Sequence, residues 1–148
     1  MKHALERSRM LAAVGALAIM AASLSCRHAL SKPDYLDRLS WVLSVTAPDT
    51  VAVGDSFQVR IDTSGNNGCW QKGRDQVSRP GPLEAHIAPY DREYVGTGIC
   101  TQNAPTFHHA VPLAASAKGL IEVFVAHRLR AASGADSTGV IQLNVYAR

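Results

Sequence analysis

The sequence lacks the short motifs that identify most hydrolases and nucleotide-binding proteins. It contains no Gly-x-Ser-x-Gly, His-Glu-x-x-His or Gly-x-x-x-x-Gly-Lys pattern, so nothing marks a serine nucleophile, a zinc-protease helix or a phosphate-binding loop. Aromatic residues make up only 6% of the chain. We therefore predict that the protein is not an enzyme and needs no cofactor.

The chain also lacks a strong excess of one charge. It has 15 Lys and Arg residues against 12 Asp and Glu residues. Three basic residues and one acidic residue lie in residues 1–25, so 15 − 3 = 12 basic and 12 − 1 = 11 acidic residues follow, a net charge of +1. A near-neutral domain has no electrostatic footprint for nucleic acid. We predict no nucleic-acid partner, and we interpret the basic residues Lys72, Arg74 and Arg79 as part of a solvated loop.

The longest apolar run, from Met10 to Leu24, is too short to span a bilayer comfortably. Lys2, Arg7 and Arg9 precede it, and small residues and Cys26 follow it. A basic start, an apolar middle and a small-residue end are typical of an export signal. Residues 1–25 are therefore predicted to be a helical signal peptide that is cleaved.

Cys26 is the odd one among three cysteines. In an oxidising compartment an unpaired thiol tends to be captured or cross-linked, and a lipid on Cys26 removes that problem. Residues 22–26 resemble the lipobox of bacterial lipoproteins, which implies acylation of Cys26 and a lipid anchor in a membrane of the bacterial cell envelope. Leu24 lies one position later than in that pattern. Cleavage without acylation, giving a secreted or periplasmic protein, is the alternative.

The mature chain is predicted to contain one domain. Residues 26–39 are polar and include Pro33, which indicates a tether. Residues 40–148 number about 110, enough for one hydrophobic core. Their apolar residues recur mostly at every second position, which is typical of strands. The clearest segments are Trp41-Leu43-Val45, Phe57-Val59-Ile61, Ile121-Val123-Val125 and Ile141-Leu143-Val145, with weaker ones at residues 83–88 and 107–113.

Residues 51–61 and the final two predicted strands resemble those of bacterial immunoglobulin-like domains. The resemblance implies an all-β, antiparallel sandwich of about seven strands; a barrel is the alternative. We predict that Ile61, Val123 and Leu143 lie in the core, because each is central on the apolar face of its strand. The last two predicted strands are expected to pair with each other.

Cys69 and Cys100 lie in turn-rich segments of an exported chain, which favours a disulfide between them. Closing a loop of this length contributes about 3.5 kcal/mol by the chain-entropy argument. The alternative is a metal site that uses both sulfurs and a histidine from the pair His108-His109. Neighbouring residues on a strand point to opposite faces, so both histidines cannot face one ion, and we predict no metal.

Gly68-Cys69-Trp70, Pro89-Tyr90-Asp91, Cys100-Thr101 and His109 resemble segments of uncharacterised bacterial lipoproteins with an immunoglobulin-like domain. That resemblance implies no activity. We predict a non-enzymatic binding or structural role, with an envelope protein or a polysaccharide as partner. A small exported metal-dependent or hydrolytic protein is the alternative.

Residues 65–82 and 90–105 are predicted to be the recognition loops, because loops vary without disturbing a core. Trp70, Tyr90 and Tyr94 would supply aromatic contact area there. The alternative is that these rings only cover the disulfide.

Overall fold

A computed structural model describes residues 34–130 and 136–148. This part of the chain forms nine strands and no helix, so the all-β prediction is confirmed. The strands are β1 (Tyr35–Leu39), β2 (Trp41–Thr46), β3 (Thr50–Val51), β4 (Ser56–Ser64), β5 (Gln71–Gly81), β6 (Glu84–Tyr94), β7 (Thr106–Ala114), β8 (Gly119–Arg130) and β9 (Asp136–Ala147). The predicted signal peptide and Cys26 lie outside the described residues.

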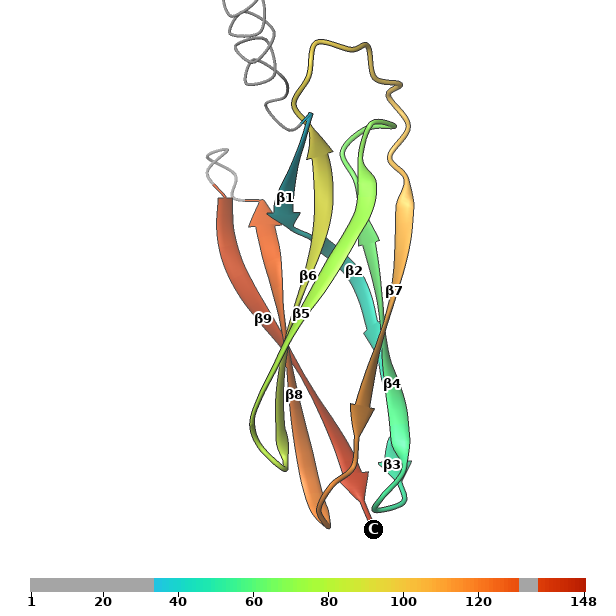
Figure 1. The fold of residues 1–148 in the computed structure, drawn as a ribbon, viewed down its shortest axis with the longest axis vertical. Helices are drawn as coiled ribbons and strands as arrows, with labels where there is room; N and C mark the ends of the chain where they lie inside the picture. The colour runs from blue at the N-terminus through green and yellow to red at the C-terminus, as the bar shows by residue number, and fades with distance from the viewer. Residues whose placement is uncertain (1–33, 131–135) are drawn as a thin grey trace, which may run out of the picture. The chain divides into compact units, whose positions relative to one another are not determined.

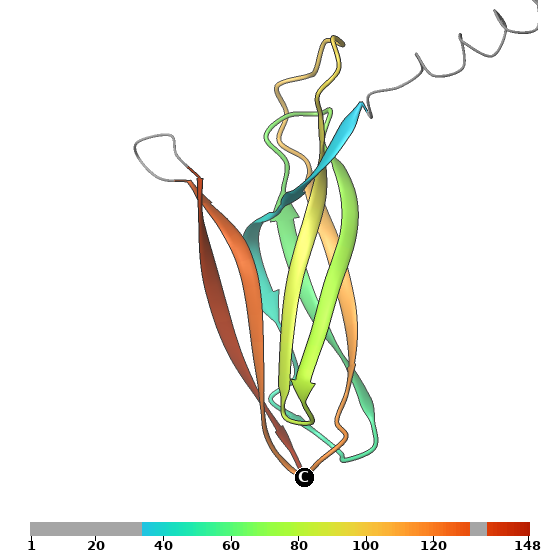
Figure 2. The same ribbon diagram turned by 60° about the vertical axis from the view of Figure 1, so that its left-hand side comes forward.

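The strands form two sheets that face each other across one core (Figures 1 and 2). The larger sheet has six strands in the order β1-β6-β8-β9-β3, and β5 pairs with β6. The smaller sheet has the order β2-β4-β7. Ser40 lies where the chain crosses from the larger sheet to the smaller one. Its backbone N–H donates to the Pro89 carbonyl, and its own carbonyl accepts from the Arg128 N–H, both at 2.9 Å.

The core forms where the inward faces of both sheets meet. Strand β4 shows why: Phe57, Val59 and Ile61 are buried while the residues between them are exposed, as expected for a strand with one solvated face. Thirteen buried residues form the cluster: Phe57, Val59, Ile61, Ala85, Ile87, Val111, Leu113, Ala115, Ile121, Val123, Val125, Val145 and Ala147.

Two of the three predicted core residues, Ile61 and Val123, are fully buried. Leu143 is only partly buried and packs against the cluster. The predicted final pair is confirmed, since β8 and β9 pair antiparallel along their full length.

Strand β2 corrects one prediction. Alternation predicted that Trp41, Leu43 and Val45 would share the inner face. A register shift in the β2–β4 pairing, between Val42 and Ser44, breaks the alternation instead. Val42 and Val45 pack against the core, and Leu43 is 61% exposed. A bulge adds one residue to the strand and so reverses the direction of the side chains that follow it.

Other differences concern boundaries and pairing. Residues 35–39, predicted as part of the tether, form β1 and pair with β6. Residues 71–81, predicted as loop, form β5, although their basic side chains are solvated as expected. The sandwich is not purely antiparallel, because β6–β8 and β3–β9 are parallel. The described residues form nine strands where about seven were predicted, and the segments that form β1, the short β3 and β5 had not been predicted as strands.

Candidate functional site

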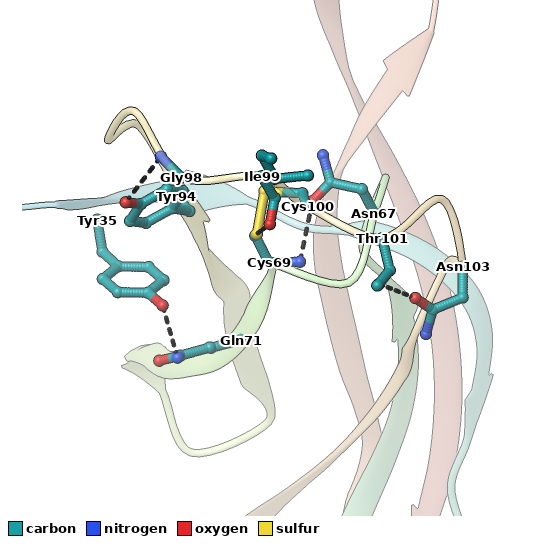
Figure 3. The surroundings of a disulfide bond; sticks show 10 residues. All are labelled: Tyr35, Asn67, Cys69, Gln71, Tyr94, Gly98, Ile99, Cys100, Thr101 and Asn103. Atoms are coloured by element: carbon teal, nitrogen blue, oxygen red, sulfur yellow. Dashed lines mark hydrogen bonds between the residues drawn. A yellow bond between two sulfur atoms is a disulfide. The ribbon is translucent and has the colours of Figure 1, made fainter.

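The disulfide tip, which we define as residues 65–70 and 95–105, lies at the end of the sandwich where β4 and β6 finish (Figure 1). Cys69 and Cys100 are disulfide-bonded, with 5.3 Å between their Cα atoms, which confirms the predicted pairing (Figure 3). Their sulfurs are therefore not free as thiolate ligands, which removes the donor set of the alternative metal site. Within residues 34–130 and 136–148, no three His, Cys, Asp or Glu residues are grouped so that they could hold a metal.

Backbone hydrogen bonds brace the two segments of the tip. The Gly68 N–H donates to the Thr101 carbonyl and the Gly65 N–H to the Pro105 carbonyl, both at 2.9 Å. The Cys69 N–H donates to Asn67 Oδ1 at 3.0 Å, which shapes the turn before the disulfide (Figure 3). The covalent bond and these hydrogen bonds connect the two segments of the tip and restrict the conformations open to them.

Trp70 does not form part of the exposed surface of the tip. Only 5% of it is exposed. Its ring packs on Trp41, with 5.3 Å between ring centroids, and the Arg128 guanidinium lies 4.5 Å from the Trp41 ring centroid. The backbone of Gly65 passes so close that a Cβ at that position would be 2.5 Å from Trp70 Cβ. Trp70 therefore offers almost no exposed area for contact in this arrangement, and its ring packs on Trp41.

Tyr90 and Tyr94 are both in strand β6 and partly buried. The Tyr94 hydroxyl accepts a hydrogen bond from the Gly98 N–H at 3.2 Å. Its ring also packs edge-on against Tyr35, with 5.4 Å between centroids. Tyr90 lies under the Arg74 guanidinium, 5.8 Å from the ring centroid. Both rings are thus already packed by other parts of this chain.

A buried polar network lies beneath the tip and links the two sheets. His109, on β7 of the smaller sheet, faces two carboxylates of the larger sheet. Its Nδ1 is 2.7 Å from Asp75 Oδ1 on β5, and its Nε2 is 3.1 Å from Asp91 Oδ1 on β6. The Thr63 hydroxyl donates to Asp91 Oδ2 at 2.7 Å. The neighbouring His108 points outward, so the predicted opposite orientation of the two histidines is confirmed.

A bulge in β5 places Asp75 in this network. Lys72 pairs with Asp91 and Asp75 with Pro89, so three steps along β5 match two steps along β6. Without the extra residue, Arg74 would stand opposite Pro89 and face inward. Gly73 makes the bulge possible, because a Cβ there would lie 2.3 Å from the Tyr90 carbonyl oxygen.

The network is an ion pair shared among three side chains. Both ring nitrogens of His109 face carboxylate oxygens, which only accept hydrogen bonds, so the imidazole is favoured in its doubly protonated form. Burial lowers the pKa of His109, but the hydrogen bond to Asp91 and the attraction of Asp75 raise that pKa above its ordinary value. Burial raises the pKa of Asp91, but the hydrogen bonds from His109 and Thr63 bring that pKa below its ordinary value.

Burial decides what this network does chemically. The side chains of His109 and Asp91 are completely shielded from solvent, and Thr63 is fully buried. No substrate atom can approach them in this arrangement. The network therefore joins the two sheets, and of its four side chains Asp75 is the one that reaches solvent, with 23% of its side chain exposed.

The sequence analysis missed this network, although one signal was present. Ala85, Ile87, Pro89 and Asp91 all occupy the same face of β6 and are buried. A carboxylate at a strand position whose alternation places it on the apolar face is expected to be buried, and a buried carboxylate needs a hydrogen-bonding or charged partner. Its partner His109 is likewise in phase with buried Val111 and Leu113 on β7. Asp75 gave no such signal, because it reaches the inner face only through the bulge.

Comparisons with protein-family profiles, with curated proteins and with solved structures find no match to this chain. Among residues 34–130 and 136–148, no helix has the length and apolar character that a membrane crossing requires. The candidate site is therefore defined by geometry alone: a disulfide-linked tip at one end of the sandwich, with a buried ion-pair network between the two sheets.

Proposed function

We propose that this protein is an exported bacterial lipoprotein, anchored to a cell-envelope membrane through Cys26, whose immunoglobulin-like domain binds a partner without catalysis. The observation that carries the proposal is the disulfide tip, in which Cys69 and Cys100 are joined. Disulfides persist in oxidising compartments, which agrees with export. The export signal and the lipobox-like residues before Cys26 support the anchor.

The tip has the composition of a binding surface. Neither residues 65–71 nor residues 95–107 contain a charged side chain. Ile99 is fully exposed, and Val95, in the same segment of the tip, is also exposed. Because the loop is already braced, less conformational entropy is lost on binding. The exposed apolar side chain would also be removed from water on association, which favours binding.

An envelope protein suits this surface better than a polysaccharide. Sugar rings are commonly bound against the free face of an aromatic ring, and at this tip Trp70 is buried while Tyr94 is covered by its own loop. The exposed contact residues are aliphatic instead. Ile99, flanked by amide and hydroxyl side chains, fits an apolar pocket with a polar rim on another protein.

Strand β1 begins beside the tip, which bears on where an anchored tip would stand. Tyr35 begins β1, its ring packs on Tyr94, and its hydroxyl accepts from Gln71 Nε2 at 2.8 Å (Figure 3). Tyr35 is nine positions after Cys26 in the sequence, so the intervening chain reaches at most about 30 Å. An anchored domain would therefore hold its tip near the membrane, and the partner would be membrane-proximal.

A capture experiment on the full chain tests the binding surface. Envelope extract is passed over wild-type protein, the Ile99→Asp variant and the Val53→Asp variant. Val53 is a matched control because, like Ile99, it is an exposed β-branched aliphatic residue. It lies between β3 and β4, outside the disulfide tip. We expect Ile99→Asp to lose the captured protein at an unchanged melting temperature and Val53→Asp to retain it. Equal capture by both variants would place the binding surface elsewhere.

The anchor is tested separately. Mass spectrometry of the purified mature protein should find acyl chains on Cys26, and Cys26→Ser should release the domain or leave the precursor unprocessed. Several acyl chains give persistent attachment, because each buried methylene contributes about 0.8 kcal/mol. A mature protein that begins at another residue and carries no lipid would exclude the anchor while leaving the tip proposal intact.

A further inference from the structure

The sheet edges of this domain are protected unequally. An open strand edge exposes unpaired N–H and C=O groups and invites pairing with another chain, so proteins block edges with charges, prolines and bulges. Strand β5 carries Lys72, Arg74, Arg79 and Pro80 and has two register shifts. Strand β7 contains Pro112, and β2 is short and bulged. Each of these edges has at least one such protection.

Residues 137–144 of strand β9 have none of these protections. Residues 137–144 pair with β8 on one side, and no described strand pairs with them on the other. The segment contains no charged residue and no proline, and its pairing with β8 has no register shift. In Figure 2, β9 lies at the left-hand border of the sandwich.

The same edge already accepts a strand at one end. Thr50 and Val51 of β3 pair in parallel with Tyr146 and Ala147, and the Tyr146 N–H donates to the Asp49 carbonyl at 2.9 Å. The backbone of β9 is thus presented for strand addition on this side. A further strand would continue the row that β3 begins.

Apolar side chains flank the open edge on both faces. Val140 points to the outer face and is 60% exposed. On the inner face, Ile141 and Leu143 are only partly buried, and Leu129 beside them is exposed. The smaller sheet has three strands against six in the larger one, and these side chains of β8 and β9 stay partly open to solvent. An added strand would bury this surface as well as pair the backbone.

We propose that the occupant is the β9 strand of a second copy of this chain, paired antiparallel about a two-fold axis to join the two larger sheets. In such a pair, each residue stands opposite a residue of the other copy whose side chain lies on the same face of the sheet. The side chains of Ile141 and Leu143 from both copies therefore form one apolar stripe. With no charge in residues 137–144, pairing within this segment brings no like charges together. This self-complementarity favours a second copy over an unrelated strand.

Sedimentation velocity of the full chain in mild detergent, over a concentration series, tests the proposal. The wild type forms a concentration-dependent dimer. The Val140→Lys variant sets like charges close together at the axis and weakens the dimer at least tenfold. The controls are Val140→Thr, which keeps a β-branched uncharged side chain, and Val77→Lys, which adds the same charge to an exposed valine of β5. Both controls dimerise as the wild type does.

Two further measurements separate edge pairing from other forms of association. Mixing the Val140→Lys variant with the Val140→Glu variant restores a mixed dimer, because opposite charges then meet. Hydrogen exchange of wild-type amides in residues 137–144 slows as concentration rises, while exchange in β5 does not change. A wild type that stays monomeric at every concentration, or a dimer unaffected by Val140→Lys, overturns the proposal. Neither result bears on binding at the disulfide tip.

Discussion

At the residue scale, the most consequential side chain is His109, since it is buried with both ring nitrogens facing carboxylates. We predict that His109→Gln lowers the free energy of unfolding by about 3 kcal/mol, because it leaves Asp91 buried without its counter-charge. Urea unfolding of both proteins near pH 6 measures this difference.

The effect of His109→Gln depends on pH, and the pKa shifts give its direction. The pKa of folded His109 is raised, so its stabilisation is complete below the unfolded value of about 6.5 and is lost as pH rises through the raised value. The pKa of folded Asp91 is lowered, so its stabilisation is present above about 3.9 and is lost as pH falls through the lowered value. The wild-type advantage should peak between these limits and shrink as pH rises above about 6.5.

The control for this prediction is His86→Gln. His86 also lies close to a carboxylate, with 2.6 Å between its Nε2 and Glu84 Oε1, but both side chains are close to half exposed. Solvent screens such a pair, so the change should alter stability by less than about 1 kcal/mol. A wild-type advantage over His109→Gln that stays constant from about pH 5 to pH 9 would show that His109 is not charged in the folded protein.

At the element scale, the β5 bulge determines whether Asp75 or Arg74 faces the interior. We predict that Gly73→Ala destabilises the domain by about 2 kcal/mol or more, because the added Cβ would meet the Tyr90 carbonyl oxygen at 2.3 Å. To relieve that contact, the backbone of β5 must move relative to the backbone of β6, and this movement takes Asp75 away from His109. Thermal unfolding measures the loss, and the His109 imidazole NMR signal reports whether its pKa falls at the same time.

Gly81→Ala is the matched control for the bulge. Gly81 ends the same strand, and a Cβ there meets no atom within 4 Å. We expect a change within about 0.5 kcal/mol, since surface substitutions without strain have small effects. Equal stability of the Gly73→Ala and Gly81→Ala variants would mean that the bulge relaxes without cost and does not position Asp75.

At the scale of the whole molecule, the disulfide joins the loop after β4 to the loop after β6. Strand β4 belongs to the smaller sheet and β6 to the larger one. Cys69 and Cys100 are 31 positions apart. Replacing both with Ser should therefore lower the free energy of unfolding by about 3.5 kcal/mol through the added entropy of the unfolded chain. Denaturant unfolding measures this loss in the full chain.

The loss of the disulfide should also have a local signature. Amide exchange should quicken in the tip, while β8 and β9 keep their protection relative to global unfolding, because they pair with each other and not with the tip. Uniformly faster exchange throughout the domain, with no additional effect in the tip, would show that the bond contributes only to global stability.

Alternation was sufficient to predict much of the fold. Phe57, Val59 and Ile61 repeat with period two, and burying that face requires a strand against a second layer. The same argument predicted β8, β9 and their pairing. It failed at Leu43, because a bulge changes the phase of a strand without any change in local composition. It also missed β1, whose short, mostly polar strand is stabilised by pairing with β6 rather than by its own pattern.

The sequence by itself determined the all-β class, the inward faces of the regular strands and the disulfide, because each follows from local pattern or from the pairing of scarce cysteines. Only the tertiary structure decided that Trp70 is buried, that Asp75 meets His109 and that one edge of β9 is open. These features depend on register and on which strands become neighbours. A shift of one residue turns a side chain from solvent to core, and the free energy that selects the register comes from contacts between segments far apart in the chain.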